Sequence, residues 1–440
     1  MSIATLKLVP LKIKCILSYL QVNKVLPVPH LFHPKMFQDL ISLFSEPLVF
    51  ISTLITVLGI ALYHIRNRGL PPGPTGLPYF GVLFSLKDDN NHVQLEEFKK
   101  TYGDIFSFTV TGKLYISFGT VKLMREAYLS HFDCFDRTMD YTMLTHVFGD
   151  SVGFINGERW KTLKRFFTQA FREYGMVKIQ NAMAGPVYDQ VQKTMDEFKE
   201  ANGKPIQLIS VFIDRCSTII RRTIFGEDGI SHQELLDLTE AYFIVTKGMT
   251  VTKLLMAGPM TRYILFPLIS DCRNALSSHR SMVKILKSVI ERHESKFDEN
   301  NVRDVIDSYL KERKDRQAKN DPSATYFSNE ALVSSLKQFV GDGISAVAAF
   351  IVSFLTGLVE HPEEQDKLYS EISDVVGTDR HPTTEDKSSL PYTNAYIYEV
   401  LRTTNFFTMF PSLECTSKTF FVLSDSTMFS CINEITKRKK

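Results

Sequence analysis

The sequence has few of the signatures that mark the commonest enzyme classes. It contains no GxGxxG or Walker loop, no HExxH and no GxSxG, which excludes the familiar dinucleotide, nucleotide, zinc-protease and serine-hydrolase sites. Six scattered cysteines form no CxxC pair, a usage typical of a reducing, cytosol-facing body. With 51 basic and 49 acidic residues the net charge is +2, so the composition predicts no nucleic-acid partner.

An apolar run from Leu48 to Tyr63 is the clearest feature near the N-terminus. It carries no charge and is slightly short for a bilayer, which needs about 17–25 residues. A membrane anchor is the favoured interpretation, and a buried core helix is the alternative. Asp39 and Glu46 precede the run and Arg66 and Arg68 follow it, which predicts that the downstream body faces the cytosol.

The segments flanking this run differ in character. Residues 71–78, PPGPTGLP, cannot continue a helix and indicate a stiff, extended spacer. Residues 1–35 carry five lysines on what would be the lumenal side, and Met36 would make a more natural start. We interpret residues 1–35 as an upstream extension or a targeting variant, and residues 36–69 as the anchor with its basic flank.

From about Leu95 the pattern is mainly helical, with a small β region. Residues 105–111 and 113–118 alternate apolar and polar side chains around Gly112, which predicts a β-hairpin. The composition, 44% hydrophobic and 23% charged, is that of a folded globular protein. A chain of 440 residues can bury an extensive core.

The segment NGERWKTLKRFF, residues 156–167, is predicted to form a helix with Trp160 and Lys164 on one face. An indole N–H and a cation placed in this way can hold a pair of carboxylates. The alternative is a core tryptophan on an amphipathic helix. A basic stripe at near-helical spacing, which is either a docking surface or a solvated face, comprises Lys161, Lys164, Arg165 and Arg172.

A long helix is predicted from Asn329 to His361, capped by Ser328 and ended by Pro362. It is apolar nearly all round, so we expect it to be buried. A second membrane span is the alternative, although Lys337 and Asp342 lie within it.

A glutamate and an arginine three residues apart, Glu399 and Arg402, can pair on one helical face. Such a pair is common on protein surfaces and does not by itself indicate a fold or a function. Here it follows HPEE at residues 361–364, an amphipathic helix and LPYTNA at residues 390–395, and this ordered set is far more specific.

In this order the motifs resemble the cytochrome P450 family, of the animal microsomal type, over residues 70–421. The resemblance implies a mainly α fold with a small β region, C-terminally incomplete, behind a membrane anchor. It implies a heme whose propionates are held by Trp160 and by Lys164, which replaces an arginine, and a Glu399–Arg402 pair that braces the heme-side core. It also implies a monooxygenase of the endoplasmic reticulum membrane, oxidising lipophilic small molecules with O2 and electrons from an NADPH-dependent reductase.

The sequence departs from the family pattern at two places. In the oxygen-activation motif Gly343 is kept, but Ser345 replaces the acid and Ala346 the threonine, so proton delivery should be impaired. The ligand loop FxxGxRxCxG has no match, because Cys415 and Cys431 lack its glycines and arginine. Residues 422–440 resemble no family segment and end in a basic tail. We therefore predict no metal ligand, through truncation or alternative splicing, and a non-catalytic family member remains the alternative function.

Overall fold

The computed structural model of the 440-residue chain divides into two units, residues 1–69 and residues 70–440. It describes residues 51–59, 69–86, 91–137, 142–173, 184–226, 228–383, 385–404, 413–416, 419–424 and 427–432. In the first unit residues 51–59 form a helix whose side chains are almost all exposed. Residues 1–35, which we interpret as an upstream extension or a targeting variant, lie outside the described residues. The rest of the expected anchor and the basic end of the tail lie outside them as well.

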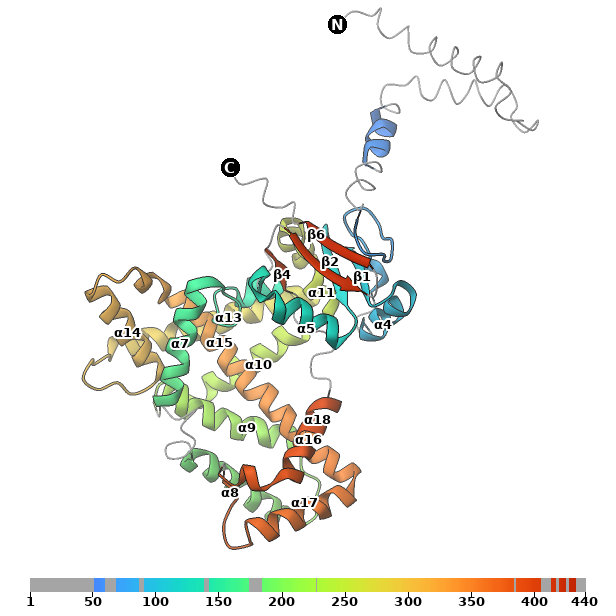
Figure 1. Ribbon diagram of the computed structural model, residues 1–440. Helices are drawn as coiled ribbons and strands as arrows, with labels where there is room; N and C mark the ends of the chain where they lie inside the picture. The colour runs from blue at the N-terminus through green and yellow to red at the C-terminus, as the bar shows by residue number, and fades with distance from the viewer. Residues whose placement is uncertain are drawn as a thin grey trace, which may run out of the picture. The chain divides into compact units, whose positions relative to one another are not determined.

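The second unit is mainly helical, which confirms the fold class expected from the sequence (Figure 1). Its α-helices are α4 (Asn91–Tyr102), α5 (Val121–Ser130), α6 (Met143–Phe148), α7 (Gly157–Glu173), α8 (Ala184–Ala201), α9 (Leu208–Ile220), α10 (His232–Lys247), α11 (Val251–Leu255), α12 (Phe266–Leu268), α13 (Ser270–Ser295), α14 (Val305–Ala318), α15 (Asn329–Gly341), α16 (Val347–Glu360), α17 (Pro362–Val375) and α18 (Pro391–Thr403). The described residues also form the π-helical turns η3 (Arg221–Phe225), η4 (Thr261–Leu265) and η6 (Asp342–Ala346). Short 3-10 turns are η1 (Leu83–Ser85), η2 (Phe132–Cys134), η5 (Pro322–Tyr326) and η7 (Asp386–Ser389).

The described strands form three two-stranded antiparallel sheets. They pair β1 (Ile105–Val110) with β2 (Lys113–Phe118), β3 (Phe135–Asp136) with β4 (Glu414–Cys415), and β5 (Thr419–Ser424) with β6 (Thr427–Ile432). The first pair is the hairpin expected around Gly112. Its two turn residues, Thr111 and Gly112, have φ of 46° and 80°, the left-handed pair that a two-residue turn between twisted strands requires.

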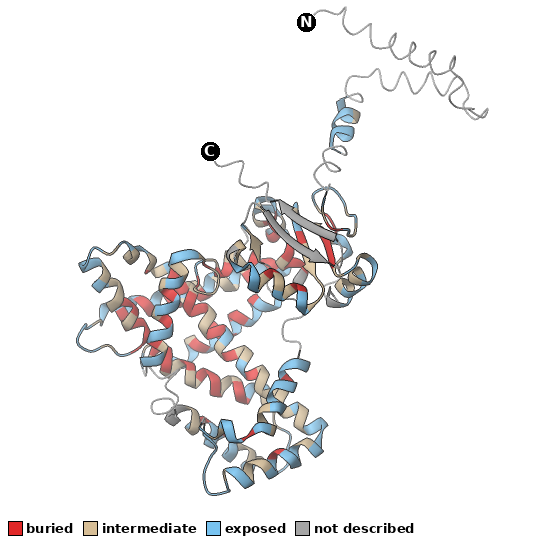
Figure 2. Ribbon diagram, viewed as in Figure 1, coloured by how far each residue is buried: buried red, intermediate tan, exposed pale blue. Residues whose placement is uncertain are grey.

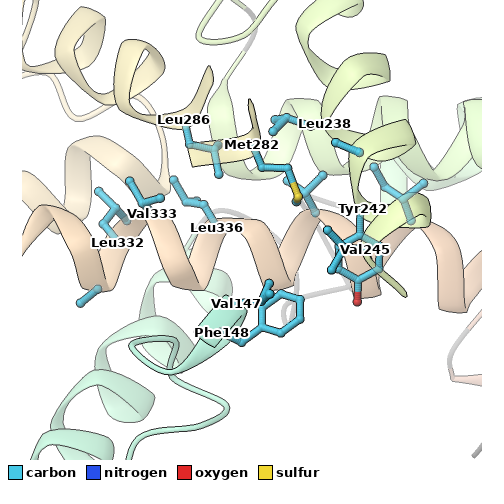
Figure 3. Packing of buried hydrophobic residues seen from close by; sticks show 14 of the residues in the cluster. Val147, Phe148, Leu238, Tyr242, Val245, Met282, Leu286, Leu332, Val333 and Leu336 are labelled. Carbon is cyan, nitrogen blue, oxygen red and sulfur yellow. The ribbon is translucent and has the colours of Figure 1, made fainter. Parts of the chain in front are cut away.

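Helix α15 runs through the middle of the main hydrophobic core. Figure 3 shows Val147 and Phe148 of α6 on one side of α15, and Met282 and Leu286 of α13 on the opposite side. Buried residues concentrate on these central helices, whereas α17 keeps only Leu368 buried (Figure 2). Each large apolar side chain that is fully buried stabilises the fold by about 1.5–3 kcal/mol.

The burial expected for the whole long helix holds for α15 but is wrong for α16. Ser328 caps α15 by accepting a hydrogen bond from the Ala331 N–H at 3.1 Å, as expected. The helix continues through η6 into α16, where Ala348 alone is buried and Val359 is 75% exposed. The reason is that α9, α17 and α18, which contact α16, cover only part of its circumference. Among the described residues, the helix from Asn329 to Glu360 is the one long and apolar enough to cross a membrane.

Candidate functional site

Helix α7 places Trp160 and Lys164 on one face, at the spacing of one helical turn. The Lys164 Nζ lies 4.5 Å from the centroid of the Trp160 ring. A second cation contacts the same ring, because the guanidinium carbon of Arg137 lies 4.1 Å from the centroid. Each such contact is worth about 0.5–2 kcal/mol, depending on how far the cation is desolvated. The half-buried indole is therefore flanked by two positive charges.

Arg137 is a site residue that no pattern in the sequence indicated. It directly follows β3, and its backbone N–H donates to the Asn156 Oδ1 at 3.0 Å, so strand pairing and a loop contact bring it to Trp160. Burial lowers the pKa of Arg137. Neither Arg137 nor Lys164 pairs with a carboxylate among the residues that the structure describes. Two cations and an indole without an acid fit a dianionic group such as a pair of propionates.

The positions to which the resemblance assigns oxygen activation, Gly343, Ser345 and Ala346, lie in the π-helical turn η6, between α15 and α16. π-Turns inside α-helices often mark functional sites. A Cβ on Gly343 would lie 2.7 Å from the Cδ1 of Ile220, so the glycine lets α9 approach closely. The Ser345 Oγ donates to the Gly341 carbonyl at 2.6 Å, and the alanine at 346 has no proton to give. The one hydroxyl among these three residues is therefore engaged by the backbone of the same helix.

An acid on η6 was not assigned from the sequence. Asp342 accepts a hydrogen bond from the hydroxyl of Tyr242 on α10. Desolvation raises the pKa of the Asp342 carboxyl, and desolvation together with the nearby carboxyl raises the pKa of Tyr242. This hydrogen bond joins α10 to the π-turn η6. It could not be predicted from a local sequence pattern, because the two residues are far apart in the chain.

Comparison of the sequence with known proteins identifies a family. The cytochrome P450 family model matches residues 71–421, which include α7, η6 and α18. The chain belongs to the cytochrome P450 family. Heme is the cofactor of this family and monooxygenation its reaction, so the resemblance carried by the order of the motifs is confirmed.

Several animal cytochromes P450 align over most of the chain. Cytochrome P450 2C25 of Mesocricetus auratus is 30% identical over 365 residues, which cover 81% of this chain and 72% of the relative. Cytochrome P450 2F3 of Capra hircus is 28% identical over 367 residues, covering 80% and 72%. Cytochrome P450 2H2 of Gallus gallus is 28% identical over 352 residues, covering 76% and 67%.

The Glu399–Arg402 pair, expected by analogy with other cytochromes P450, lies on α18. The Arg402 Nε and Nη2 donate to the two carboxylate oxygens of Glu399 at 2.7 and 2.6 Å, which lowers the pKa of Glu399. Both side chains are more than half exposed in the described structure. Exposed pairs contribute little to stability. The bracing role that the P450 resemblance implies therefore stays a prediction.

The residues expected to hold the heme propionates are brought together here, but none of the described cysteines has the setting of a thiolate ligand. Burial raises the pKa of the Cys216 thiol on α9 to about 11, so it is protonated at neutral pH. Cys272 is fully buried on α13. Cys134 and Cys415 belong to a small apolar cluster with Ile105 and Leu123, and Cys415 is held opposite Phe135 in the β3–β4 pair. The side chain of Cys431 lies outside the described residues.

One described cluster, His293, Asp304 and Asp307, has metal-binding chemistry, but its hydrogen bonds are already satisfied. The His293 Nδ1 lies 2.7 Å from the Val289 carbonyl and the Nε2 3.2 Å from the Asp304 Oδ2. Both ring nitrogens face acceptors, so the ring is best satisfied as an imidazolium. Asp304 also accepts from the Asp307 N–H, and Arg303 binds both oxygens of Asp307. The cluster joins α13 to α14 and is structural.

Proposed function

We propose that this chain is a membrane-bound cytochrome P450 that oxidises lipophilic small molecules with O2 and electrons from an NADPH-dependent reductase. The observation that carries the proposal is the pair of cations on the Trp160 ring. Trp160 and Lys164, together with Arg137, would bind the heme propionates, and heme would supply the oxygen chemistry when bound. The iron ligand has to come from outside the described side chains. The domain would span residues 70–421.

The proposed location is the endoplasmic reticulum membrane, with the body facing the cytosol, and exposed apolar side chains support the membrane contact. In the helix of residues 51–59, Leu54 and Ile55 are 56% and 65% exposed, which suits a lipid environment. On η4 and α12, Tyr263, Ile264 and Leu268 are also exposed. The basic stripe on α7 is exposed at Lys161, Lys164, Arg165 and Arg172, where an acidic reductase could dock.

A non-catalytic family member is the second candidate. It is favoured by Ser345 and Ala346, which offer no free proton donor in η6, and by the lack of a fitting thiolate among the described cysteines. Such a protein would bind lipophilic molecules or the reductase without turnover.

The reduced, carbon-monoxide difference spectrum of membranes containing the chain separates the two candidates. The proposed function predicts a thiolate-type band. Because Lys164 and Trp160 would hold the propionates, Lys164→Met and Trp160→Phe should each lower heme content several-fold. Lys161→Met is the matched control, since Lys161 lies on the same helix and pairs only with Glu158 in the described structure. Protein shown to be present without any heme band would establish the non-catalytic candidate.

A further inference from the structure

The exposed side of α13 carries a row of cations that has no part in the proposed propionate contacts. Successive members are separated by seven, four and three residues, each close to a whole number of helical turns, so their side chains share one face. At a rise of 1.5 Å per residue the row is about 20 Å long. All of its members are exposed, and we call them the α13 stripe: Arg273, Arg280, Lys284 and Lys287.

The positive charge of the α13 stripe is not neutralised by the described part of the chain. None of its cations forms an ion pair there. Two acids of the same helix are engaged elsewhere, because Asp271 pairs with Lys253 and Glu294 pairs with Arg313. Glu291, the next acid on the face of the stripe, forms no ion pair within the described structure either. The stripe therefore presents charge of one sign to its surroundings.

Exposed apolar side chains directly precede the stripe, on η4 and α12 and beside them. They are separated by three, one and four residues, so they lie on one side of these short helical segments. We call them the apolar patch: Met260, Tyr263, Ile264 and Leu268, which are 39%, 66%, 52% and 71% exposed. Apolar side chains gathered in this way mark a surface for a partner or a membrane.

The apolar patch and the α13 stripe adjoin each other. The Nη1 of Arg273, the first cation of the stripe, donates to the Pro267 carbonyl of α12 at 3.4 Å. Farther along α13, Arg280 faces the same region as Arg262 of η4. Burial is the main cause of the lowered pKa of His146, and the charges of both arginines add to the effect. The two features thus form one amphipathic surface.

A membrane with anionic lipids fits both halves of this surface. Apolar side chains can enter the boundary between headgroups and acyl chains, while lysine and arginine meet the anionic headgroups. The cytoplasmic leaflet has a negative surface potential, and each lysine or arginine near it favours attachment by about five-fold. An acidic protein surface would complement the α13 stripe but would leave the apolar patch without a partner.

We propose that the α13 stripe binds anionic phospholipid headgroups of the membrane that the apolar patch contacts. The assignment rests on the membrane location in the proposed function and adds the lipid class that residues 70–440 recognise. It needs neither heme nor turnover.

The test is the reactivity of Lys284 and Lys287 in the full chain, held in nanodiscs of phosphatidylcholine or of equal parts phosphatidylcholine and phosphatidylserine. A water-soluble acetylating reagent modifies exposed lysines, and mass spectrometry reads each position. We expect both lysines to react at least about five-fold more slowly with phosphatidylserine present. Lys193 and Lys199, exposed on α8 and apart from α13 in Figure 1, should react equally in both kinds of disc.

Salt provides a second measurement on the unaltered chain. Raising the ionic strength from about 0.15 M to about 1 M shortens the Debye length from about 8 Å to about 3 Å, so the protection by phosphatidylserine should disappear. Protection that persists at high salt overturns the assignment, because a contact between charges at the headgroup surface would be screened.

Paired substitutions locate the effect. Arg273→Gln together with Arg280→Gln should remove most of the protection of the two stripe lysines. Lys193→Gln together with Lys199→Gln is the matched control, since it lowers the net charge equally and should keep the protection. Protection that survives the arginine substitutions overturns the proposal.

The remaining outcomes separate this proposal from the proposed function. Equal reactivity in discs that hold the chain overturns the lipid assignment alone, as does slowing that appears only after an acidic protein such as the reductase is added. A chain that does not enter the discs overturns the membrane location and the lipid assignment together. A missing heme band leaves the lysine reactivities unaffected.

Discussion

Two buried basic residues, His293 and Lys337, have pKa values displaced in opposite directions, and the difference lies in their partners. Burial alone would lower both. For His293 the hydrogen bond and charge of Asp304 outweigh burial, and the pKa is raised. For Lys337 no close carboxylate is present among the described residues, and burial prevails.

For His293 the displacement predicts a pH-dependent stability. Its folded pKa lies above the unfolded value of about 6.5, so the stabilisation is complete below that pH and is lost as the pH rises through the folded pKa. We expect His293→Gln to lower the free energy of unfolding by about 1–2 kcal/mol at acidic pH and to remove this slope. Urea unfolding across the range from mildly acidic to mildly alkaline pH measures both effects.

The exposed His361, whose ring lies 3.3 Å from a carboxylate oxygen of Glu363 in the described structure, supplies the control for this prediction. His361→Gln should leave the slope unchanged. A His293→Gln variant with the stability profile of the unaltered chain would show that Asp304 does not hold the ring as an imidazolium.

Residues that interact along one helix could be predicted from the sequence, and those brought together by tertiary packing could not. Trp160 lies four residues before Lys164, and Glu399 lies three residues before Arg402, so each pair shares one face of a helix and its contact is predictable. Arg137 reaches Trp160 through tertiary packing, because its backbone N–H donates to Asn156 and the preceding strand β3 pairs with β4, which lies almost three hundred positions further along the chain. No period in the sequence encodes a contact of that kind.

Among the elements, the hairpin and the long helix were predictable because alternation, a cap and a proline are local signals. The π-turn η6 and the partial exposure of α16 were not, because they depend on how α9, α17 and α18 pack. A hydrophobic pattern shows that a helix can be buried but not how many neighbours will cover it.

At the centre of the long helix, two glycines should respond differently to the same substitution. A Cβ on Gly341 would overlap the ring of Tyr242, whereas one on Gly343 would meet only the terminal methyl of Ile220, which can move. Alanine is favoured over glycine in helices by about 1 kcal/mol, so packing decides the sign. We expect Gly341→Ala to lower the free energy of unfolding by about 1–3 kcal/mol and Gly343→Ala to change it less.

Chemical denaturation of the two variants measures the two free energies of unfolding and so tests the expected clash with Tyr242. Equal losses in both variants would mean that the ring of Tyr242 yields as easily as a methyl group.

At the scale of the whole molecule, the order of motifs sufficed to predict the family and the mainly α fold, because each motif is weak but their sequence is specific. For the thiolate ligand of the iron, the order of motifs predicts only that the family's cysteine loop is absent. Residue type alone does not show that Cys216 is held as a thiol or that Cys415 is fixed in a strand pair.

Removal of residues 1–69 should alter membrane attachment more than folding. This unit is separate from residues 70–440, and its described helix exposes Leu54, Ile55 and Leu58. We expect the shortened chain to be released from membranes by alkaline carbonate while it keeps the helical circular-dichroism signal of residues 70–440. A shortened chain that resists extraction as the full chain does would place the attachment in the second unit.

The π-turn has a consequence for the phase of the long helix. One extra residue in a turn advances the helical phase by about 100°, so the stripe that faces the core before the turn is rotated after it. Before η6, helix α15 contacts α6, α10 and α13. After η6, helix α16 contacts α9, α17 and α18. Loss of a single residue between positions 342 and 346 would restore an unbroken phase and turn the second half toward the wrong neighbours. The π-turn η6 thus allows one continuous helix to pack against two different groups of helices.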